Sequence, residues 1–204
     1  MGLATIAGLL ALSGALADGV PAGDAAHGAK IGYTCFGCHG IADYRNAYPA
    51  YHVPKIGGQH EAYLVAALGE YRSGARPHTT MRAQAGSMSE QDVRDVAAYF
   101  ATSSPVTSNG KATGTAPAAA AVCAACHGAD GVGILPDYPT LAGQQADYIE
   151  QALKAYRKGT RQNAIMNGFA AQLKDEDITA LASYFSQQQN SLRVPKAPEG
   201  AVGR

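Results

Sequence analysis

Residues 35–40 read CFGCHG, and residues 123–128 read CAACHG. In each stretch two cysteines stand three positions apart, and a histidine directly follows the second. On one helical turn, two thiols at this spacing can each add to a vinyl group of haem, and the imidazole that follows can lie under the iron. We therefore expect two covalently attached haem c groups, with the attachment residues Cys35, Cys38, Cys123 and Cys126.

Other uses of paired cysteines fit this pattern less well. A zinc site needs four ligands, and two cysteine pairs that stand 88 positions apart do not match the spacing of a zinc ribbon. A thioredoxin-like motif needs a βαβ setting, which the sequence does not predict. Two disulfides in an exported protein remain an alternative, but they leave the two following histidines unexplained.

The iron of each haem needs two axial ligands, and the sequence offers both. We expect His39 and His127 to supply the first, and a thioether sulfur is the usual second ligand in this chemistry. Met81 and Met166 occupy equivalent positions after these histidines, once a three-residue insertion in the first half is counted. The expected iron ligands are therefore His39 with Met81 and His127 with Met166. Met88 is a rival that aligns with a leucine, and core packing is the interpretation we favour for it.

The sequence beyond these motifs is also duplicated. Residues 54–81 (PKIGGQHEAYLVAALGEYRSGARPHTTM) align without a gap with residues 139–166 (PTLAGQQADYIEQALKAYRKGTRQNAIM), at an offset of 85. The cysteine motifs are offset by 88, so the first half carries three extra residues between His39 and Pro54. The chain therefore contains two copies of one unit.

The sequence of each copy predicts three helices joined by a long irregular loop. The first is expected from about residue 24 to 38, and in the second copy from about 116 to 126. Apolar residues recur at helical spacing within 63–71 and within 148–156, which predicts an amphipathic middle helix. No alternating strand pattern of useful length is present, so the expected fold class is all-α.

Residues of known capping preference mark the ends of these helices. Gly74 and Gly159 are placed to end the middle helices. Ser89 begins the last helix of the first copy, and Asp92 follows three positions later in a capping-box pattern.

The N-terminus has the features of a secretory signal. Residues 3–16 are uncharged and mostly apolar, but a membrane-spanning helix needs about 20 residues. Ala15-Leu16-Ala17 fits the small-x-small rule for cleavage. We interpret residues 1–17 as a signal peptide of an exported protein, with a retained signal acting as a weak membrane tether as the alternative.

These features divide the remaining chain into two domains. Residues 103–115 have the serine-, glycine- and proline-containing composition of a mobile linker. The expected segments are domain 1 at 18–102, the linker at 103–115, domain 2 at 116–190, and an exposed C-terminal tail at 191–204.

Composition excludes some classes of partner. Lys plus Arg number 16 and Asp plus Glu number 16, so the formal charge is zero and no general basic field exists. Nucleic acid is therefore not an expected partner.

Several further residues are weaker candidates for a role at the haems. Pro54 and Pro139 are positioned to offer a backbone carbonyl to the haem histidines, with a plain loop proline as the alternative. Gln59, Gln144, Arg72 and Arg157 are candidates for contacts with haem propionates, with a solvated helix face as the alternative for the arginines. The other histidines are expected to be exposed polar or surface residues: His27, His52, His60 and His78.

Together these residues resemble the dihaem cytochromes c of the cytochrome c4 type. The motif AAAVCAACHGADG and the paired P-x-[IL]-[AG]-G-Q … Y … R-x-G-x-R … M stretches carry the resemblance, which covers nearly all of residues 24–188. It implies two class I cytochrome c domains that face one another across a pseudo-twofold interface. It also implies a periplasmic carrier that passes electrons toward a terminal oxidase, sometimes in association with the membrane. The loop Ile41–Val53, rich in tyrosine, departs from the family pattern.

The leading functional hypothesis is an electron carrier that is not itself an enzyme. If histidine and methionine fill both axial positions, neither iron has an open site for a substrate, and methionine favours the reduced iron. The alternative is an electron-accepting cytochrome subunit of a periplasmic dehydrogenase. In both cases the expected partners are redox proteins.

Overall fold

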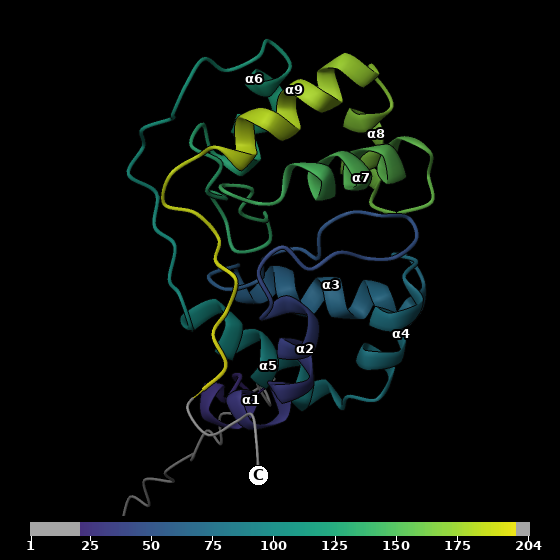
Figure 1. Ribbon diagram of the computed structural model, residues 1–204, viewed down its shortest axis with the longest axis vertical. Coiled ribbons are helices and arrows are strands. Elements are labelled where there is room, and N and C mark those ends of the chain that lie inside the picture. The colour runs from purple at the N-terminus through teal and green to yellow at the C-terminus, as the bar shows by residue number, and fades with distance from the viewer. Residues whose placement is uncertain (1–20, 199–204) are drawn as a thin grey trace, which may run out of the picture.

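The computed structural model describes residues 21–198. The predicted signal peptide, residues 1–17, lies outside this range, as do the last residues of the predicted tail. Within the described range the chain forms helices and no β-strand, with isolated bridges between single residue pairs. The all-α prediction is confirmed, and the two copies form two stacked helical units (Figure 1).

The helices of the two copies correspond in order. Those of the first copy are α1 (Ala25–Ile31), the 3-10 helix η1 (Gly32–Cys35), α2 (Phe36–His39), α3 (Glu61–Ser73), α4 (Thr79–Gly86) and α5 (Glu90–Thr102). Those of the second copy are α6 (Ala120–His127), α7 (Ala146–Arg157), α8 (Ala164–Ala170) and α9 (Asp175–Ser186).

The predicted first helix is continuous only near the second motif. In the first copy it is broken into α1, η1 and α2. Residues 32–37 read GYTCFG there, whereas residues 120–125 of the second copy read AAVCAA. Glycine and threonine are poorer helix formers than alanine, which accounts for the break.

Two predicted helix boundaries are confirmed. Ser89 caps α5, because its Oγ accepts a hydrogen bond from Asp92 N at 3.1 Å, and a carboxylate oxygen of Asp92 accepts one from Ser89 N at 2.9 Å. Gly74 ends α3 in the left-handed region with φ 86°, which a residue with a side chain adopts only under strain.

The long loop, predicted to be irregular, contains a short helix in each copy. The N-cap residues of these helices, α4 and α8, are His78 and Asn163, whose side chains accept hydrogen bonds from Met81 N at 3.2 Å and from Met166 N at 3.1 Å. A polar acceptor at this position stabilises the first turn of a helix. The expectation for His78 was therefore wrong, since it is a half-buried helix cap and not an exposed polar residue.

Equivalent phenylalanines lie at the centres of the two cores. Phe100 on α5 is 1% exposed and packs against Phe36, with ring centroids 5.5 Å apart. Phe185 on α9 is 2% exposed and packs in a cluster with Ile149 of α7 and Leu181 of its own helix. Each copy therefore has its own small hydrophobic core.

A reciprocal pair of glutamines closes the boundary between the copies. Gln59 Nε2 donates to Thr140 O at 3.0 Å, and Thr140 N donates to Gln59 Oε1 at 2.8 Å. Gln144 makes the same two bonds with the main chain of Lys55, both at 2.9 Å. Because Lys55 and Thr140 are equivalent positions, the boundary has approximate twofold symmetry, as predicted. The amides of both glutamines are used here, so their expected contact with haem propionates is replaced by a contact between the copies.

The segment 191–198 contradicts the expectation of an exposed tail. Leu192 is 1% exposed, and its N–H donates to Ala142 O of the second copy at 2.9 Å. Arg193 and Gly57 of the first copy exchange two hydrogen bonds, at 2.9 and 3.1 Å. Figure 1 shows this segment descending from the upper unit to the lower one. Burial of an apolar side chain and pairing of the main chain hold it as a strap across both copies.

The predicted linker, residues 103–115, has no regular structure and is largely exposed, yet it is tied to the second copy at two points. Ser108 Oγ donates to Asp130 at 2.5 Å. Thr113 and Gln188 exchange two hydrogen bonds, at 2.7 and 2.9 Å.

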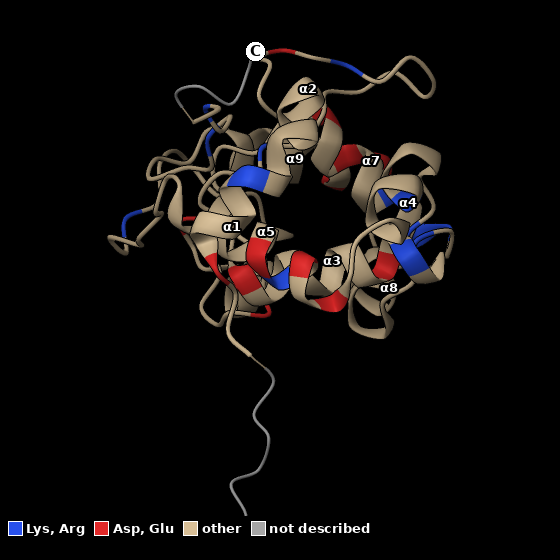
Figure 2. Cartoon of the chain, turned by 90° about the horizontal axis from the view of Figure 1, so that it is seen from below, with Lys and Arg blue, Asp and Glu red and all other residues tan. Residues whose placement is uncertain are grey.

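Charged residues of both signs are distributed over the first copy. Figure 2 shows acidic positions along α5 and α3, which lie next to each other. These positions are Glu90, Asp92 and Asp95 on α5 and Glu61 and Glu70 on α3.

Candidate functional site

A continuous cavity of about 480 Å³ lies between the two copies and reaches both cysteine motifs. The sequence predicted two sites, and the structure joins them into one space. Cys126 is half-buried on α6 and is not among the residues that line it. The other predicted site residues all line the cavity: Cys35, Cys38, His39, Met81, Cys123, His127 and Met166.

A proline carbonyl orients the histidine of each motif. The Nδ1 atom of His39 lies 2.8 Å from Pro54 O, and that of His127 lies 2.8 Å from Pro139 O. A carbonyl only accepts, so Nδ1 carries the proton and Nε2 keeps its lone pair. Burial lowers the pKa of both imidazoles, which favours this neutral form. The expected role of Pro54 and Pro139 is confirmed.

The four cysteines, all within the described part of the chain, carry free thiols. Burial raises the pKa of Cys35 and of Cys123, so both are protonated at neutral pH. The structure therefore does not contain the two disulfides that the sequence left open, and the thiols can form thioether bonds.

The two methionines are presented by the short helices that the sequence did not predict. Met81 on α4 and Met166 on α8 are half-buried and line the cavity. Met88 also reaches the cavity wall, but it packs against the first core, beside Phe36 and Phe100. This packing is the role that the sequence favoured for it.

Two buried arginines, Arg76 and Arg161, lie at the boundary, and neither is among the residues that the sequence predicted at the site. Their exposed fractions are 7% and 5%. The guanidinium carbon of Arg76 lies 4.4 Å from the ring centroid of Tyr71, and that of Arg161 lies 4.4 Å from the ring centroid of Tyr156. Arg76 and Arg161 occupy the same position in the two aligned copies, and this identity was the signal in the sequence that could have identified them.

Each arginine also donates to a tyrosine of the other copy. Arg76 donates to the hydroxyl of Tyr148, and Arg161 Nη2 donates to the hydroxyl of Tyr63 at 3.2 Å. Burial opposes ionisation of Tyr63, but the two guanidiniums outweigh it and lower the pKa of Tyr63 to about 8. The centre of the boundary therefore has a positive potential.

The arginines considered from the sequence have a different role. Arg72 donates to Ala85 O at 3.2 Å and Met88 O at 2.9 Å, and Arg157 donates to Leu173 O at 2.9 Å. Each therefore ties the middle helix of its copy to the segment before the last helix. Neither of the two roles considered from the sequence, a contact with haem propionates or a place on a solvated helix face, fits Arg72 and Arg157.

Three histidines expected at the surface make specific contacts. His27 is half exposed but pairs with Asp95. His52 Nδ1 lies 2.8 Å from a carboxylate oxygen of Asp147 in the second copy. His60 Nδ1 lies 3.0 Å from Leu135 O, also in the second copy. His52 and His60 are thus half-buried boundary residues, and the surface expectation is wrong for both.

The rims of the two motifs differ in polarity. Beside the second motif, Val122, Ile165 and Phe169 are large apolar residues with exposed side chains. The aligned residues of the first copy are polar: Thr34, Thr80 and Gln84. The approximate symmetry of the boundary therefore does not extend to the outer surface.

These residues fit a covalently attached haem on each side of the boundary. Each side offers free thiols, an imidazole with an unprotonated Nε2 and a thioether sulfur. Buried aromatic residues, Phe100 and Phe185, line the wall and would exclude water from the ring. The Nε atom of Arg161 is buried without a hydrogen-bond partner, which suits an anionic group such as a haem propionate.

Comparison with known proteins gives a consistent result. A family model described as cytochrome c matches residues 25–104 and again residues 112–189. The chain is 36% identical over 179 residues to cytochrome c4 of Pseudomonas aeruginosa, which spans 80% of this chain and 88% of that protein. It is 32% identical over 172 residues to a thiosulfate dehydrogenase electron acceptor of Stutzerimonas stutzeri, which spans 74% of this chain and 77% of that protein.

A solved structure resembles the whole arrangement. The crystal structure of reduced recombinant cytochrome c4 from Pseudomonas stutzeri superposes with a TM-score of 0.66 at 33% sequence identity. The match covers 82% of this chain and 100% of that one. Among residues 21–198, no helix combines the length and the apolar character that a membrane span requires.

Proposed function

The chain belongs to the cytochrome c family and is an electron-carrying dihaem cytochrome, and from this premise we propose that it works in the periplasm as a carrier toward a terminal oxidase and not as an enzyme. The apolar, uncharged segment at residues 3–16 supports export. The relatives named cytochrome c4 support the role of a carrier. Its partners are other redox proteins.

The proposed attachment and ligand residues are those in the two motifs and the two short helices. Thioether bonds join the haems to Cys35 and Cys38 and to Cys123 and Cys126. The proposed iron ligands are His39 with Met81 and His127 with Met166. Haem c, when bound, supplies one-electron cycling between ferric and ferrous iron.

The protein contributes orientation and exclusion of water. Pro54 O and Pro139 O hold each imidazole in one tautomer and one plane, so that little reorganisation accompanies a change of charge. The caps at His78 and Asn163 fix the first turns of α4 and α8, and these turns position the thioethers. The buried arginines supply positive charge where haem carboxylates need it.

One observation carries this proposal. In both copies a neutral, carbonyl-bound histidine, a free thiol and a methionine reach the same cavity, although the methionine and the proline carbonyl come from segments of the chain outside the cysteine motif.

We assign the second motif as the point of contact with redox partners. Its rim exposes Val122, Ile165 and Phe169, and an apolar patch near a redox centre favours close, transient docking. The aligned positions of the first copy, Thr34, Thr80 and Gln84, are polar, and the exposed aromatic residue beside the first motif is Tyr33.

Carbon monoxide tests whether either iron is open. The reduced protein should show no change in its absorption spectrum under carbon monoxide, because both axial positions are filled. Rapid binding to one or both haems would instead support a haem enzyme and contradict the carrier proposal.

A second candidate function is the electron-accepting subunit of a periplasmic dehydrogenase, favoured by the similarity to the thiosulfate dehydrogenase electron acceptor. Size-exclusion chromatography of a native extract separates the two. A carrier elutes near the mass of the single chain, whereas a permanent subunit elutes with its dehydrogenase.

A further inference from the structure

Of the two buried arginines at the boundary, Arg161 forms an ion pair with an acidic side chain and Arg76 does not. Glu70 Oε2 lies 3.8 Å from Arg161 Nη2. Among residues 21–198, no other carboxylate forms an ion pair with Arg161, and none forms one with Arg76. Two guanidiniums and one carboxylate leave the cluster with one excess positive charge. A buried excess charge is costly unless an anion offsets it.

Two polar atoms of this ion pair have no hydrogen-bond partner. They are Arg161 Nε and Glu70 Oε2, and both are buried. Arg161 also lines the cavity that the two motifs share. An anionic group inside that cavity could satisfy the guanidinium, and each haem brings two propionate carboxylates.

Glu70 breaks the symmetry of this cluster. The arginines, the stacked tyrosines Tyr71 and Tyr156, and the boundary glutamines all have identical counterparts in the other copy. The counterpart of Glu70 is Ala155. Arg76 therefore has no carboxylate in the position from which Glu70 faces Arg161.

We infer that Glu70 makes the reduction potentials of the two haems unequal, because it partly neutralises Arg161 and leaves Arg76 unneutralised. The inference rests on the proposed function, since it needs a haem on each side of the boundary. Ferric iron carries one more positive charge than ferrous iron, so a nearby cation raises the potential and a carboxylate that offsets the cation lowers it. The burial of the cluster limits screening by salt.

Unequal potentials would give an electron a preferred haem within one molecule. The symmetric part of the boundary cannot produce such a preference, because its charges are repeated in both copies. Glu70 thus favours one of the two similar haems as the site that holds the electron.

The test is an electrochemical titration of the two-haem protein, with each haem followed by its own paramagnetically shifted methyl signals in the NMR spectrum. Glu70→Gln removes the charge and keeps the shape of the side chain. We expect it to raise one potential clearly more than the other. Ala155→Glu supplies the missing carboxylate beside Arg76. We expect it to lower chiefly the potential of the haem that Glu70→Gln affects less.

Glu61→Gln is the matched control, because it removes the same charge from an exposed position on the same helix. It should leave the difference between the two potentials unchanged. Equal shifts of both haems in Glu70→Gln, or shifts no larger than those of the control, would overturn the inference even if Ala155→Glu does not fold. A wild-type protein without two haems would instead overturn the proposed function.

Discussion

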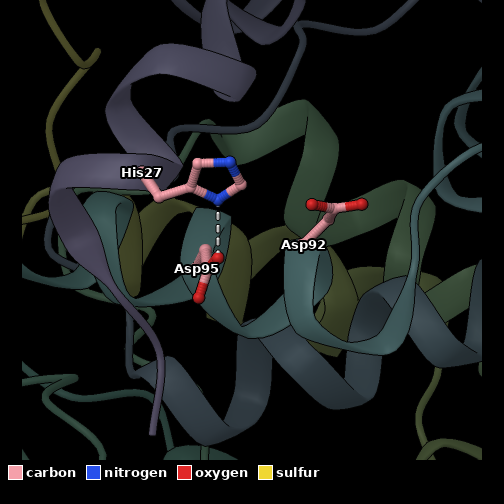
Figure 3. A group of neighbouring side chains, drawn as sticks. All are labelled: His27, Asp92 and Asp95. Carbon is pink, nitrogen blue, oxygen red and sulfur yellow. Dashed lines mark hydrogen bonds and ion pairs between the residues drawn. The ribbon is translucent and has the colours of Figure 1, made fainter.

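The Nδ1 atom of His27 on α1 lies 2.7 Å from Oδ2 of Asp95 on α5, and this contact holds α1 against α5 (Figure 3). Asp95 is 2% exposed, and its other oxygen accepts hydrogen bonds from Asp24 N and Gln91 Nε2, both at 2.7 Å. Asp92, also drawn in Figure 3, is engaged in the cap of α5. The three side chains therefore act in packing and capping.

Replacing the buried carboxylate should destabilise the first copy. Burial opposes ionisation of Asp95, but its hydrogen bonds outweigh burial and hold the pKa of Asp95 below the ordinary value. Asp95→Asn should lower the free energy of unfolding by about 2 kcal/mol at neutral pH. A depressed pKa stabilises the fold above the unfolded-state pKa, and this contribution disappears as the pH falls through the folded-state pKa. The difference between wild type and variant should therefore shrink below about pH 4.

Urea unfolding at a series of pH values measures this difference. Asp137→Asn, at an exposed position, is the control and should change stability little at any pH. A difference for Asp95→Asn that stays constant down to pH 3 would contradict the assigned role of the carboxylate.

The reciprocal glutamines should hold the two copies together. Gln59→Ala leaves both main-chain groups of Thr140 without partners, which should cost about 2 kcal/mol. In the double variant with Gln144→Ala, unfolding in guanidinium chloride should separate into two transitions, because each copy has its own core. Gln172→Ala, at an exposed position, is the control. A single transition with an unchanged midpoint would show that the glutamines do not couple the copies.

The choice between Met81 and Met88 as the ligand of the first haem can be made by absorption. Met81→Ala should abolish the sulfur-to-iron band of one haem only and lower the potential of that haem, because methionine favours ferrous iron. Met88→Leu should leave the spectrum unchanged and cost less than about 1.5 kcal/mol, since it nearly conserves volume. Loss of the band in Met88→Leu, with the band retained in Met81→Ala, would reverse the assignment.

The apolar rim of the second motif should govern contact with an apolar redox surface. The double variant Ile165→Thr and Phe169→Gln gives this rim the residues found at the aligned positions of the first copy, Thr80 and Gln84. Electron transfer to a gold electrode coated with a methyl-terminated alkanethiol should slow by about tenfold, because less apolar area is buried on contact. Leu135→Thr, another exposed apolar position, should behave as wild type. If the double variant transfers electrons as fast as wild type, the apolar rim does not contribute to contact with redox partners.

Features set by local sequence could be predicted. The duplication, the amphipathic middle helices and the Ser89 cap follow from residue spacing and short-range hydrogen bonding. The proline carbonyls could be proposed because Pro54 and Pro139 occupy equivalent positions after their motifs. The short helix α4 was missed because it has no sustained apolar stripe, and its cap is a histidine, which is not a usual N-cap residue.

Features set by contacts between the copies could not be predicted. Residues 191–198 have the composition of a tail, and only the pairing of Arg193 with Gly57 makes them a strap. Arg76 and Arg161 each donate to a tyrosine of the other copy. Their identity in the alignment marked them as equivalent, but no residue spacing indicates which charges meet across a boundary.

The mass of the denatured, purified mature protein shows whether two haems are covalently attached to it. Thioether bonds survive denaturation, so intact-protein mass spectrometry should give the mass of the polypeptide plus two haems. In the double variant Cys123→Ala and Cys126→Ala, the mass should equal that of the polypeptide plus one haem. A wild-type mass equal to that of the polypeptide alone, or of the polypeptide with one haem, would contradict the account.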